Sequence, residues 1–272
     1  MSISSNIKLN NGVEIPILGL GVYLSGKDTY TAVRTALDEG YRHIDTAMVY
    51  ENESDVGRAV KDSGIAREDI FITTKLWNDD MRANNVRGAA EKSLALLGLD
   101  YIDLYLIHWP VAGKFMPSYK VMEDLYRKGM FRAIGVSNFL SHHMDALLKE
   151  TEVVPAVNQI EIHPYLTNQT EIDYCKAKGI APEAWAPLAR GKAVKDKTIK
   201  AIAKKYNKTP AQIVIRWHIQ RGVIVIPKSV TSKRIAENAK VFDFLLSAED
   251  ISAINALNMG LRTGPDPDTF DF

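Results

Sequence analysis

Apolar positions along this chain follow two alternating patterns. Short apolar runs, typical of buried strands, are each followed by a stretch in which apolar residues recur three and four positions apart, typical of amphipathic helices. The first pattern predicts strands at residues 17–21, 43–45, 70–75, 102–107, 133–136, 156–160, 180–185 and 223–226. The second predicts helices at residues 29–39, 52–63, 84–97, 119–128, 141–149, 169–178, 197–206, 209–220, 232–240 and 248–257.

This alternation predicts the fold class. Eight strand–helix units follow one another, and no Gly/Ser linker, low-complexity tract or repeat divides the chain. We therefore expect an α/β protein with a single (β/α)8 TIM barrel, in which residues 1–272 form one domain, rather than an open sheet. The turn signal Asn10-Asn11-Gly12 lies between two short strand-like runs and predicts an N-terminal β-hairpin at one end of the barrel. The remaining helices are expected as additions to the barrel.

Four polar side chains fall at or just beyond the ends of consecutive predicted strands, where barrels of this class carry their chemistry. Asp45 and Tyr50 follow one strand, Lys75 ends the next, and His108 follows the one after. A phenol titrates near about 10, so Tyr50 needs a neighbouring cation to donate a proton at neutral pH. We expect Tyr50 to be hydrogen-bonded to Lys75, which pairs with Asp45, while His108 directs a substrate carbonyl oxygen. Each residue alone fits an ordinary ion pair, rim tyrosine or core histidine equally well, but their convergence on one barrel face favours carbonyl reduction.

A second cluster follows the last predicted strand. Lys228 and Ser229 come directly after it, Thr231 or Ser232 can cap the next helix, and Arg234 lies in that helix's first turn. A helix N-terminus with hydroxyls and cations nearby is suited to a phosphate, and cations there oppose the helix dipole unless an anion is bound. Solvated surface charges are the alternative interpretation.

Several aromatic residues lie just beyond predicted strands, where a flat cofactor ring or an apolar substrate could lie against them: Tyr23, Trp77, Trp109 and Trp185. Core packing is the alternative for each of them.

Gly19-Leu20-Gly21 begins like a dinucleotide-binding fingerprint, but Leu24 replaces the third glycine.

Metal and thiol chemistry are not expected. His142-His143 and His163 lack metal-ligand spacing with cysteines or carboxylates, so no metal site is predicted. Cys175, in a predicted helix, fits inert packing better than a nucleophile.

Composition narrows the class of partner. Lys and Arg number 34 against 33 acidic residues, which argues against nucleic acid or an anionic membrane as a partner. The single cysteine excludes an internal disulfide and fits a reducing compartment, and no apolar run has the length of a signal or a membrane span. We expect a cytoplasmic protein that acts on small molecules.

Three blocks of sequence resemble the aldo-keto reductases: GYRHIDTAMVYENESDVG, MFRAIGVSNF and IPKSVTSKRIAEN. The resemblance extends over essentially the whole chain and is greatest to short-loop microbial members, those called diketogluconate or glyoxal reductases, or in some protists prostaglandin F synthases. It implies a (β/α)8 barrel that binds NADPH across the strand ends without a Rossmann fold, and a monomer.

The resemblance also implies roles for individual residues. The catalytic positions correspond to Asp45, Tyr50, Lys75 and His108, with Tyr50 as the proton donor. The cofactor positions correspond to Gly21, Val22, Tyr23, Asp45, Ser137, Asn138, Gln159, Trp185, Ala186, Pro187, Leu188, Lys228, Ser229, Val230, Thr231, Arg234, Glu237 and Asn238. The substrate pocket corresponds to Tyr23, Met48, Tyr50, Trp77, His108 and Trp109.

Two departures from the family pattern concern the pocket. Ala186 stands where a serine is usual, which removes a hydroxyl contact to the cofactor. Met48 stands where a small residue is common, which would narrow the space beside Tyr50.

The predicted function is NADPH-dependent reduction of aldehydes and ketones. The alternatives are an NADPH-binding sensor with little turnover and a phosphate-handling barrel hydrolase or isomerase. The substrate stays open among methylglyoxal, aromatic aldehydes, keto-sugars and a prostaglandin endoperoxide.

Overall fold

Eight parallel strands form one sheet in the computed structural model, which describes residues 1–272. The strands are β3 (Leu20–Gly21), β4 (His43–Asp45), β5 (Phe71–Leu76), β6 (Ile102–Ile107), β7 (Phe131–Ser137), β8 (Val157–Glu161), β9 (Ala181–Trp185) and β10 (Ile224–Val225), and neighbours in the chain are neighbours in the sheet. The two edges meet, because Leu18 pairs with Val225 and Gly21 with Lys228 through parallel bridges. The sheet therefore closes on itself, and the predicted (β/α)8 barrel is confirmed.

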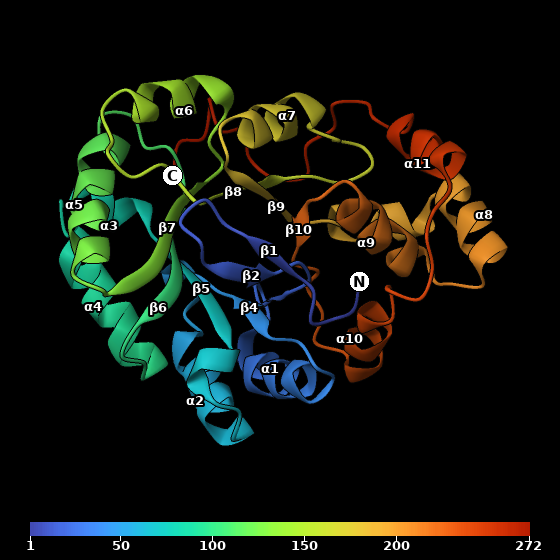
Figure 1. Cartoon of the computed structure of the whole chain (residues 1–272), viewed down its shortest axis with the longest axis horizontal. Coiled ribbons are helices and arrows are strands. Elements are labelled where there is room, and N and C mark those ends of the chain that lie inside the picture. Colours follow the sequence, from blue (N-terminus) through green and yellow to red (C-terminus); the bar gives the residue numbers. More distant parts are fainter.

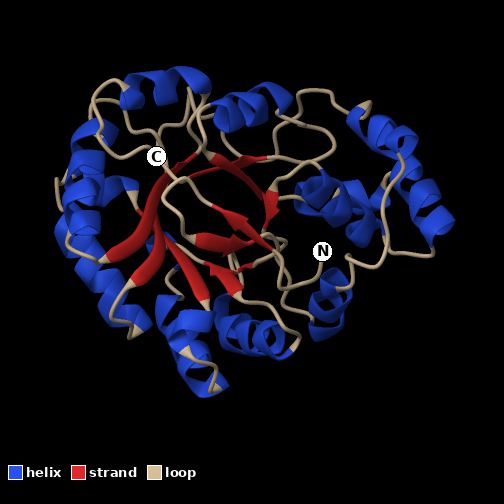
Figure 2. Cartoon of the chain, viewed as in Figure 1, coloured by secondary structure: helices blue, strands red, loops and turns tan.

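Helices lie outside the central strands (Figures 1 and 2). They are α1 (Thr29–Asp38), α2 (Glu53–Ser63), α3 (Asn78–Arg82), α4 (Val86–Leu97), α5 (Phe115–Arg127), α6 (Ser141–Leu148), α7 (Gln169–Ala177), α8 (Lys197–Tyr206), α9 (Pro210–Gln220), α10 (Ser232–Ala239) and α11 (Ala248–Asn255). Helices α3, α8 and α11 are additions to the eight strand–helix units. None of the helices combines the length and apolar content that crossing a membrane requires.

Local signals in the sequence account for several helix ends. Thr209 begins α9 with a capping box, in which its side chain accepts a bond from the amide of Gln212 and the Gln212 side chain accepts one from Thr209. Pro210 takes the first helical position, where no amide hydrogen is needed. Helix α2 ends at Gly64, whose φ of 70° is the left-handed conformation that stops helices at low steric cost.

The N-terminal hairpin closes one end of the barrel. Strands β1 (Asn6–Lys8) and β2 (Glu14–Pro16) pair antiparallel and lie across the central strands in Figure 1. Ile15 of this hairpin is fully buried in a cluster with Phe71 and Leu104 from the barrel strands. The carboxyl ends of the strands, at the opposite mouth, are left for chemistry.

The element boundaries differ most from the prediction in three places. The helix predicted at residues 84–97 begins at Val86, and the short helix α3 before it was not predicted; Asn84, with a left-handed φ of 55°, lies between the two. Helix α5 begins at Phe115 rather than residue 119, because Pro117 falls in the first turn, where a missing amide hydrogen costs nothing. The strand predicted at residues 17–21 is regular only at Leu20–Gly21.

Candidate active site

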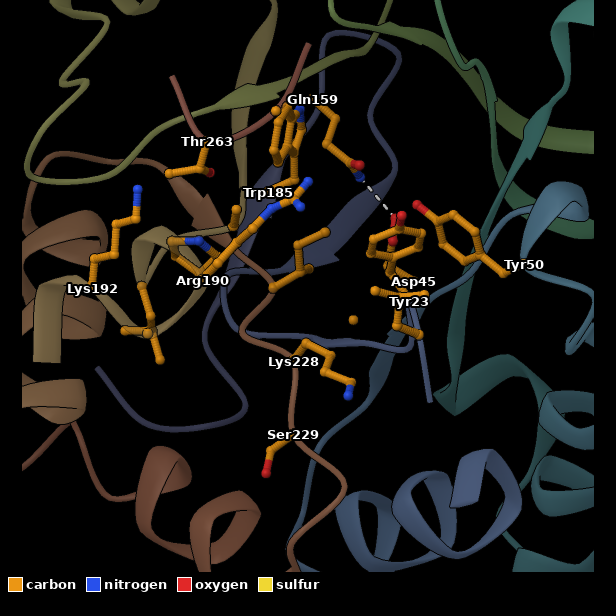
Figure 3. A pocket seen from close by; sticks show the side chains of 18 of the residues that line it. Tyr23, Asp45, Tyr50, Gln159, Trp185, Arg190, Lys192, Lys228, Ser229 and Thr263 are labelled. Atoms are coloured by element: carbon orange, nitrogen blue, oxygen red, sulfur yellow. Dashed lines mark hydrogen bonds between the residues drawn. The ribbon is translucent and has the colours of Figure 1, made fainter. Parts of the chain in front are cut away.

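Asp45 and Lys75 form a buried ion pair at the carboxyl end of the barrel. The Nζ atom of Lys75 donates to Oδ1 and Oδ2 of Asp45 at 2.7 and 2.8 Å, and to the backbone oxygen of Thr46 at 2.8 Å. The side chain of Gln159 donates to Oδ2 of Asp45 at 2.7 Å (Figure 3). All three protons of the ammonium group are therefore used by Asp45 and Thr46, and the charge is held in one place.

Tyr50 lies beside this pair but is not hydrogen-bonded to Lys75, so that part of the prediction is wrong. The Nζ atom of Lys75 lies 5.3 Å from the centroid of the Tyr50 ring, and its protons are already donated elsewhere. Burial raises the pKa of Tyr50 well above its ordinary value near 10, and the carboxylate of Asp45 raises it further. The predicted acidification by Lys75 is thus outweighed, and Tyr50 keeps its proton at neutral pH.

His108 is a neutral donor facing the same space. Burial, and then the charge on Lys75, hold the pKa of His108 well below its ordinary value near 6.5. Its ring packs edge-on against Tyr50 and Trp77, with centroid distances of 5.8 and 5.2 Å. Nδ1 is buried without a partner, so the tautomer that carries the proton on Nε2 presents an uncharged N–H group to the pocket.

The ends of β7, β8 and β9 are tied together by side chains. The amide of Asn138 donates to the backbone oxygen of His108 at 3.0 Å and accepts a bond from the indole nitrogen of Trp185 at 2.8 Å. The hydroxyl of Ser137 donates to the backbone oxygen of Gln159 at 2.8 Å. Asn138 and Ala186 both adopt left-handed φ angles, of 63° and 47°. These bonds and turns fix the orientation of the indole ring at the pocket wall.

A buried acid lies below the site, inside the barrel. Glu183 is fully buried, and its Oε1 atom lies 3.8 Å from Nε2 of His43 on β4. Burial, and then the charge on Asp45, raise the pKa of Glu183 to about 8. Burial lowers the pKa of His43 to about 3. At neutral pH both groups are therefore mostly uncharged, which leaves Asp45 and Lys75 as the charged pair next to them.

One elongated cavity of about 1510 Å³ extends from Asp45, Tyr50 and His108 to the far side of the barrel mouth. Asp45, Tyr50 and Tyr23 lie together at one end, and Arg190 and Lys192 lie at the other (Figure 3). Pockets for drug-sized ligands usually measure about 300–1,000 Å³. The cavity is therefore large enough for a long ligand and a small second molecule together.

The cavity is rich in cations. Five basic residues line it, with Arg190 and Lys192 at the end remote from Tyr50 (Figure 3), and sequence reasoning identified only the last two of the five: Arg190, Lys192, Lys195, Lys228 and Arg234. The three missed residues follow β9 in an irregular stretch, with Arg190 at a left-handed φ of 51°, and no periodic pattern marks them. Such a cluster attracts an anionic ligand.

The predicted phosphate-binding segment adjoins these cations. Ser229 is 7% exposed, and its hydroxyl accepts a bond from the amide of Thr231 at 3.1 Å. Thr231 is the N-cap residue of α10, but its side chain accepts no bond from the helix, so the predicted side-chain cap is not formed. The first-turn amides of α10 are therefore free of a side-chain cap, and Arg234 projects from the same turn into the cavity.

Most of the predicted site residues line this one cavity. They are Gly21, Tyr23, Asp45, Tyr50, Trp77, His108, Trp109, Ser137, Asn138, Gln159, Trp185, Ala186, Pro187, Leu188, Lys228, Ser229, Val230, Thr231, Arg234, Glu237 and Asn238. Lys75 lies behind Asp45 and acts on the cavity through it.

Besides Lys75, two predicted site residues do not line the cavity. Val22 is fully buried in the main core, and its backbone N–H and C=O bond to Asp45 and Asn52. Met48 packs against the main core, and Val49 lines the cavity instead. Met48 therefore does not narrow the pocket beside Tyr50 as expected.

The C-terminal segment also contributes to the cavity, which the sequence did not reveal. Thr263, Gly264, Pro265 and Phe272 line it. Glu161 at the end of β8 holds this segment by accepting bonds from the amides of Thr263 and Gly264 at 2.6 and 3.3 Å. A Cβ atom on Gly264 would lie 2.4 Å from the indole of Trp185, so only glycine allows this close approach.

Two residue sets set aside by the sequence analysis lie outside the cavity. Cys175 is fully buried, and burial raises the pKa of its thiol to about 11, which fits inert packing. His142 and His143 were expected to lack a carboxylate partner, but Asp268 from the C-terminal segment lies beside both of them.

Comparisons with known proteins agree with this geometry. The sequence profile of the Aldo/keto reductase family matches residues 18–259. The chain is 50% identical over 273 residues to a glyoxal reductase of Bacillus subtilis (strain 168), covering 100% of this chain and 99% of that protein. It is 49% identical to the methylglyoxal reductase DkgA of Escherichia coli (strain K12), covering 97% of each chain.

A solved structure extends the likeness to the fold. The crystal structure of a Bombyx mori aldo-keto reductase in complex with NADP superposes with a TM-score of 0.92 at 38% identity, covering 98% of this chain and 97% of that one. The catalytic-type residues, the long cationic cavity and these likenesses agree. The chain belongs to the aldo/keto reductase family and is an oxidoreductase that acts on carbonyl groups.

Proposed function

We propose that this protein uses NADPH to reduce small aldehydes and ketones, including 2-oxoaldehydes of the glyoxal type, with Tyr50 as the proton donor. The observation that carries the proposal is the cavity itself, which has Tyr50 and Asp45 at one end and is lined by five basic residues, two of them at the other end (Figure 3). The names of the relatives, glyoxal reductase and methylglyoxal reductase, favour small dicarbonyl substrates.

The basic residues of the cavity suit a nicotinamide dinucleotide that carries an extra phosphate. Ser229 precedes α10 and Arg234 lies in its first turn, where they would hold the adenosine phosphate, and Asn238 lines the cavity from the last turn of the same helix. Trp185 would lie against the nicotinamide ring, and Asn138, Ser137 and Gln159 stand beside it. When bound, NADPH supplies a hydride to the carbonyl carbon of the substrate.

Tyr50 and His108 complete the reaction at the carbonyl oxygen. The N–H group of His108 donates a hydrogen bond to that oxygen and orients it, because the ring is neutral and lines the same end of the cavity. As hydride arrives, negative charge develops on the oxygen and makes it far more basic than a carbonyl. Tyr50, protonated at neutral pH, then transfers its phenolic proton to it.

Lys75 and Asp45 hold the site rather than exchange protons with the substrate. The ammonium charge lies 5.3 Å from the Tyr50 ring, where it favours the phenolate that proton transfer leaves behind. Asp45 fixes the ammonium group in that position through two hydrogen bonds. The opposing carboxylate keeps the resting site close to neutral, so the phenol does not ionise before substrate arrives.

A Tyr50→Phe variant tests the proposal. Reduction of methylglyoxal with NADPH should fall by at least about 100-fold, the usual contribution of a positioned general acid. Binding of NADPH, followed by quenching of tryptophan fluorescence, should be nearly unchanged. Comparable turnover in the variant would refute the role of Tyr50, and loss of NADPH binding would mean that the variant had lost its fold. The alternative of a sensor with little turnover gains no support from relatives that are named as reductases.

A further inference from the structure

Two adjacent histidines on α6 and a carboxylate of the C-terminal segment converge outside the cavity. The Nε2 atoms of His142 and His143 lie 3.0 and 3.4 Å from the same oxygen, Oδ1 of Asp268. The two imidazole rings face each other with centroids 4.0 Å apart. Three ligand atoms, one from each residue, lie within 4.8 Å of one another. This is the only cluster of at least three such side chains in the molecule that is compact enough to hold a metal ion.

Two of the three separations between ligand atoms match a tetrahedral zinc site. Zn²⁺ binds imidazole nitrogen and carboxylate oxygen at about 2.0–2.1 Å, so two ligand atoms of a tetrahedral site are separated by about 3.3–3.4 Å. The two nitrogen–oxygen separations, 3.0 and 3.4 Å, are close to that edge length. Two histidines and one carboxylate would leave a fourth position for water, as three-ligand zinc sites do.

Metal binding requires a change of tautomer at His143. Nδ1 of His143 accepts a bond of 3.3 Å from the amide of Leu140. A metal on Nε2 requires the proton on Nδ1, so the bond from Leu140 is exchanged for the bond to the metal.

The position of Asp268 connects the cluster to the cavity. Asp268 shortly precedes Phe270 and Phe272, whose rings pack on Trp109 with centroid distances of 5.0 and 5.3 Å. Phe272 also stacks on Trp77 at 5.8 Å, and both Trp77 and Trp109 line the cavity next to His108. The side chains of His142 and Asp268 are 60% and 47% exposed, so water competes for their contact.

We propose that His142, His143 and Asp268 form a site for Zn²⁺, or a similar borderline transition-metal ion, that fastens the C-terminal segment to α6. Imidazole and carboxylate together favour such ions over Mg²⁺ and Ca²⁺, which prefer sites made of oxygen atoms alone. The bound ion holds the segment that carries Phe270 and Phe272 against the wall of the cavity. The ion takes no part in the reduction.

Competition with a chromophoric zinc indicator tests the site on the full chain, without reference to turnover. The protein should take up one equivalent of Zn²⁺ saturably, and millimolar Mg²⁺ or Ca²⁺ should not displace it. His142→Ala and Asp268→Asn should each weaken binding by at least about tenfold, the smallest effect of losing even an outer-shell partner of a metal. Both changes are at exposed side chains, so the fold should remain intact. Asp271→Asn, which removes the same charge from the same segment, is the matched control and should bind as the unchanged protein does.

Hydrogen exchange measured with and without Zn²⁺ tests the fastening. Zn²⁺ should slow exchange in residues 264–272 and at the start of α6 of the unchanged protein and of Asp271→Asn, but not of Asp268→Asn. Absence of saturable zinc uptake, or uptake of equal affinity in all variants, would show that the cluster is only a pair of histidine–carboxylate contacts. Binding without slower exchange would refute the fastening of the segment. None of these measurements depends on the proposed reductase activity, so the two proposals can fail separately.

Discussion

Glu183 offers a quantitative test of the electrostatics inside the barrel. Its carboxyl group is fully buried on β9, and neither oxygen has a hydrogen-bond partner. Burial raises its pKa from 4.5 to about 8, with a further contribution from the negative charge of Asp45. The folded protein therefore keeps a proton on Glu183 over a range of pH in which the unfolded chain has already released it.

The consequence for stability has a definite sign. Between about pH 4.5 and pH 8 the folded state binds one more proton than the unfolded state at this position, so the free energy of unfolding falls as pH rises. At about 1.4 kcal/mol per pH unit, the whole interval corresponds to on the order of 5 kcal/mol. The loss is complete once the pH has passed about 8.

Replacing Glu183 by Gln removes the titration while keeping the size and shape of the side chain. We expect the free energy of unfolding of the unchanged protein to fall relative to that of Glu183→Gln as pH rises from 5 to 8, by about 3 to 4 kcal/mol. Urea denaturation at pH 5, 6, 7 and 8, followed by circular dichroism, measures that difference. Other titrating groups, such as His43, are common to both proteins and largely cancel in the comparison. Glu68→Gln, on an exposed carboxylate, is the control and should give a profile parallel to that of the unchanged protein.

Two parallel pH profiles for the unchanged protein and Glu183→Gln would refute the reasoning. That result would mean that Glu183 ionises in the folded state with no more difficulty than in the unfolded chain. Water or another polar group would then have to solvate the carboxylate inside the barrel. Asp45 and Lys75 would then not be the only charged groups around Glu183.

Three further substitutions test the site. Lys75→Met should lower the free energy of unfolding by about 3 to 5 kcal/mol, because Asp45 would remain buried without its cation. Adding Asp45→Asn should recover much of the lost thermal stability without restoring reduction. Arg234→Ala should raise the KM for NADPH by roughly tenfold or more and the KM for NADH little, whereas Lys233→Ala, next to it but outside the cavity, should change neither. Equal effects of Arg234→Ala on both cofactors would show that the extra phosphate does not bind there. Gly264→Ala should push the indole of Trp185 out of its position and lower the free energy of unfolding by about 1 to 3 kcal/mol. A fluorescence titration should show NADPH binding weakened at least about fivefold. Unchanged affinity would show that the indole can move freely.

The sequence by itself determined the barrel and most of the site. Alternating strand and helix periods predict eight units, and the structure has them in chain order around a closed sheet. Asp45, Lys75 and His108 were found because the carboxyl ends of parallel strands meet at one mouth of a barrel, so residues far apart in the chain share one space. This inference needs only the order of the elements and not their side-chain packing.

Tertiary structure alone decided which charges control Tyr50. Strand ends show that Lys75 comes near Tyr50, but they do not show that Asp45 and Thr46 take all three ammonium protons. Nor do they show how deeply the phenol is buried, and burial is what raises its pKa. The direction of a pKa shift depends on competition between desolvation and nearby charges, and that competition is settled by distances of a few ångströms.

The sequence likewise did not predict which side chains of the irregular segments reach the cavity. Arg190 and Lys192 enter the cavity through a turn with no periodic pattern, and Phe272 reaches it from the end of the chain. The carboxylate of Asp268 meets His142 although 126 positions separate them in the chain, so no local spacing could reveal the cluster. Periodicity and strand ends predict what regular elements do, because a buried face imposes a repeat. Loops and termini follow contacts that form only once the barrel has closed.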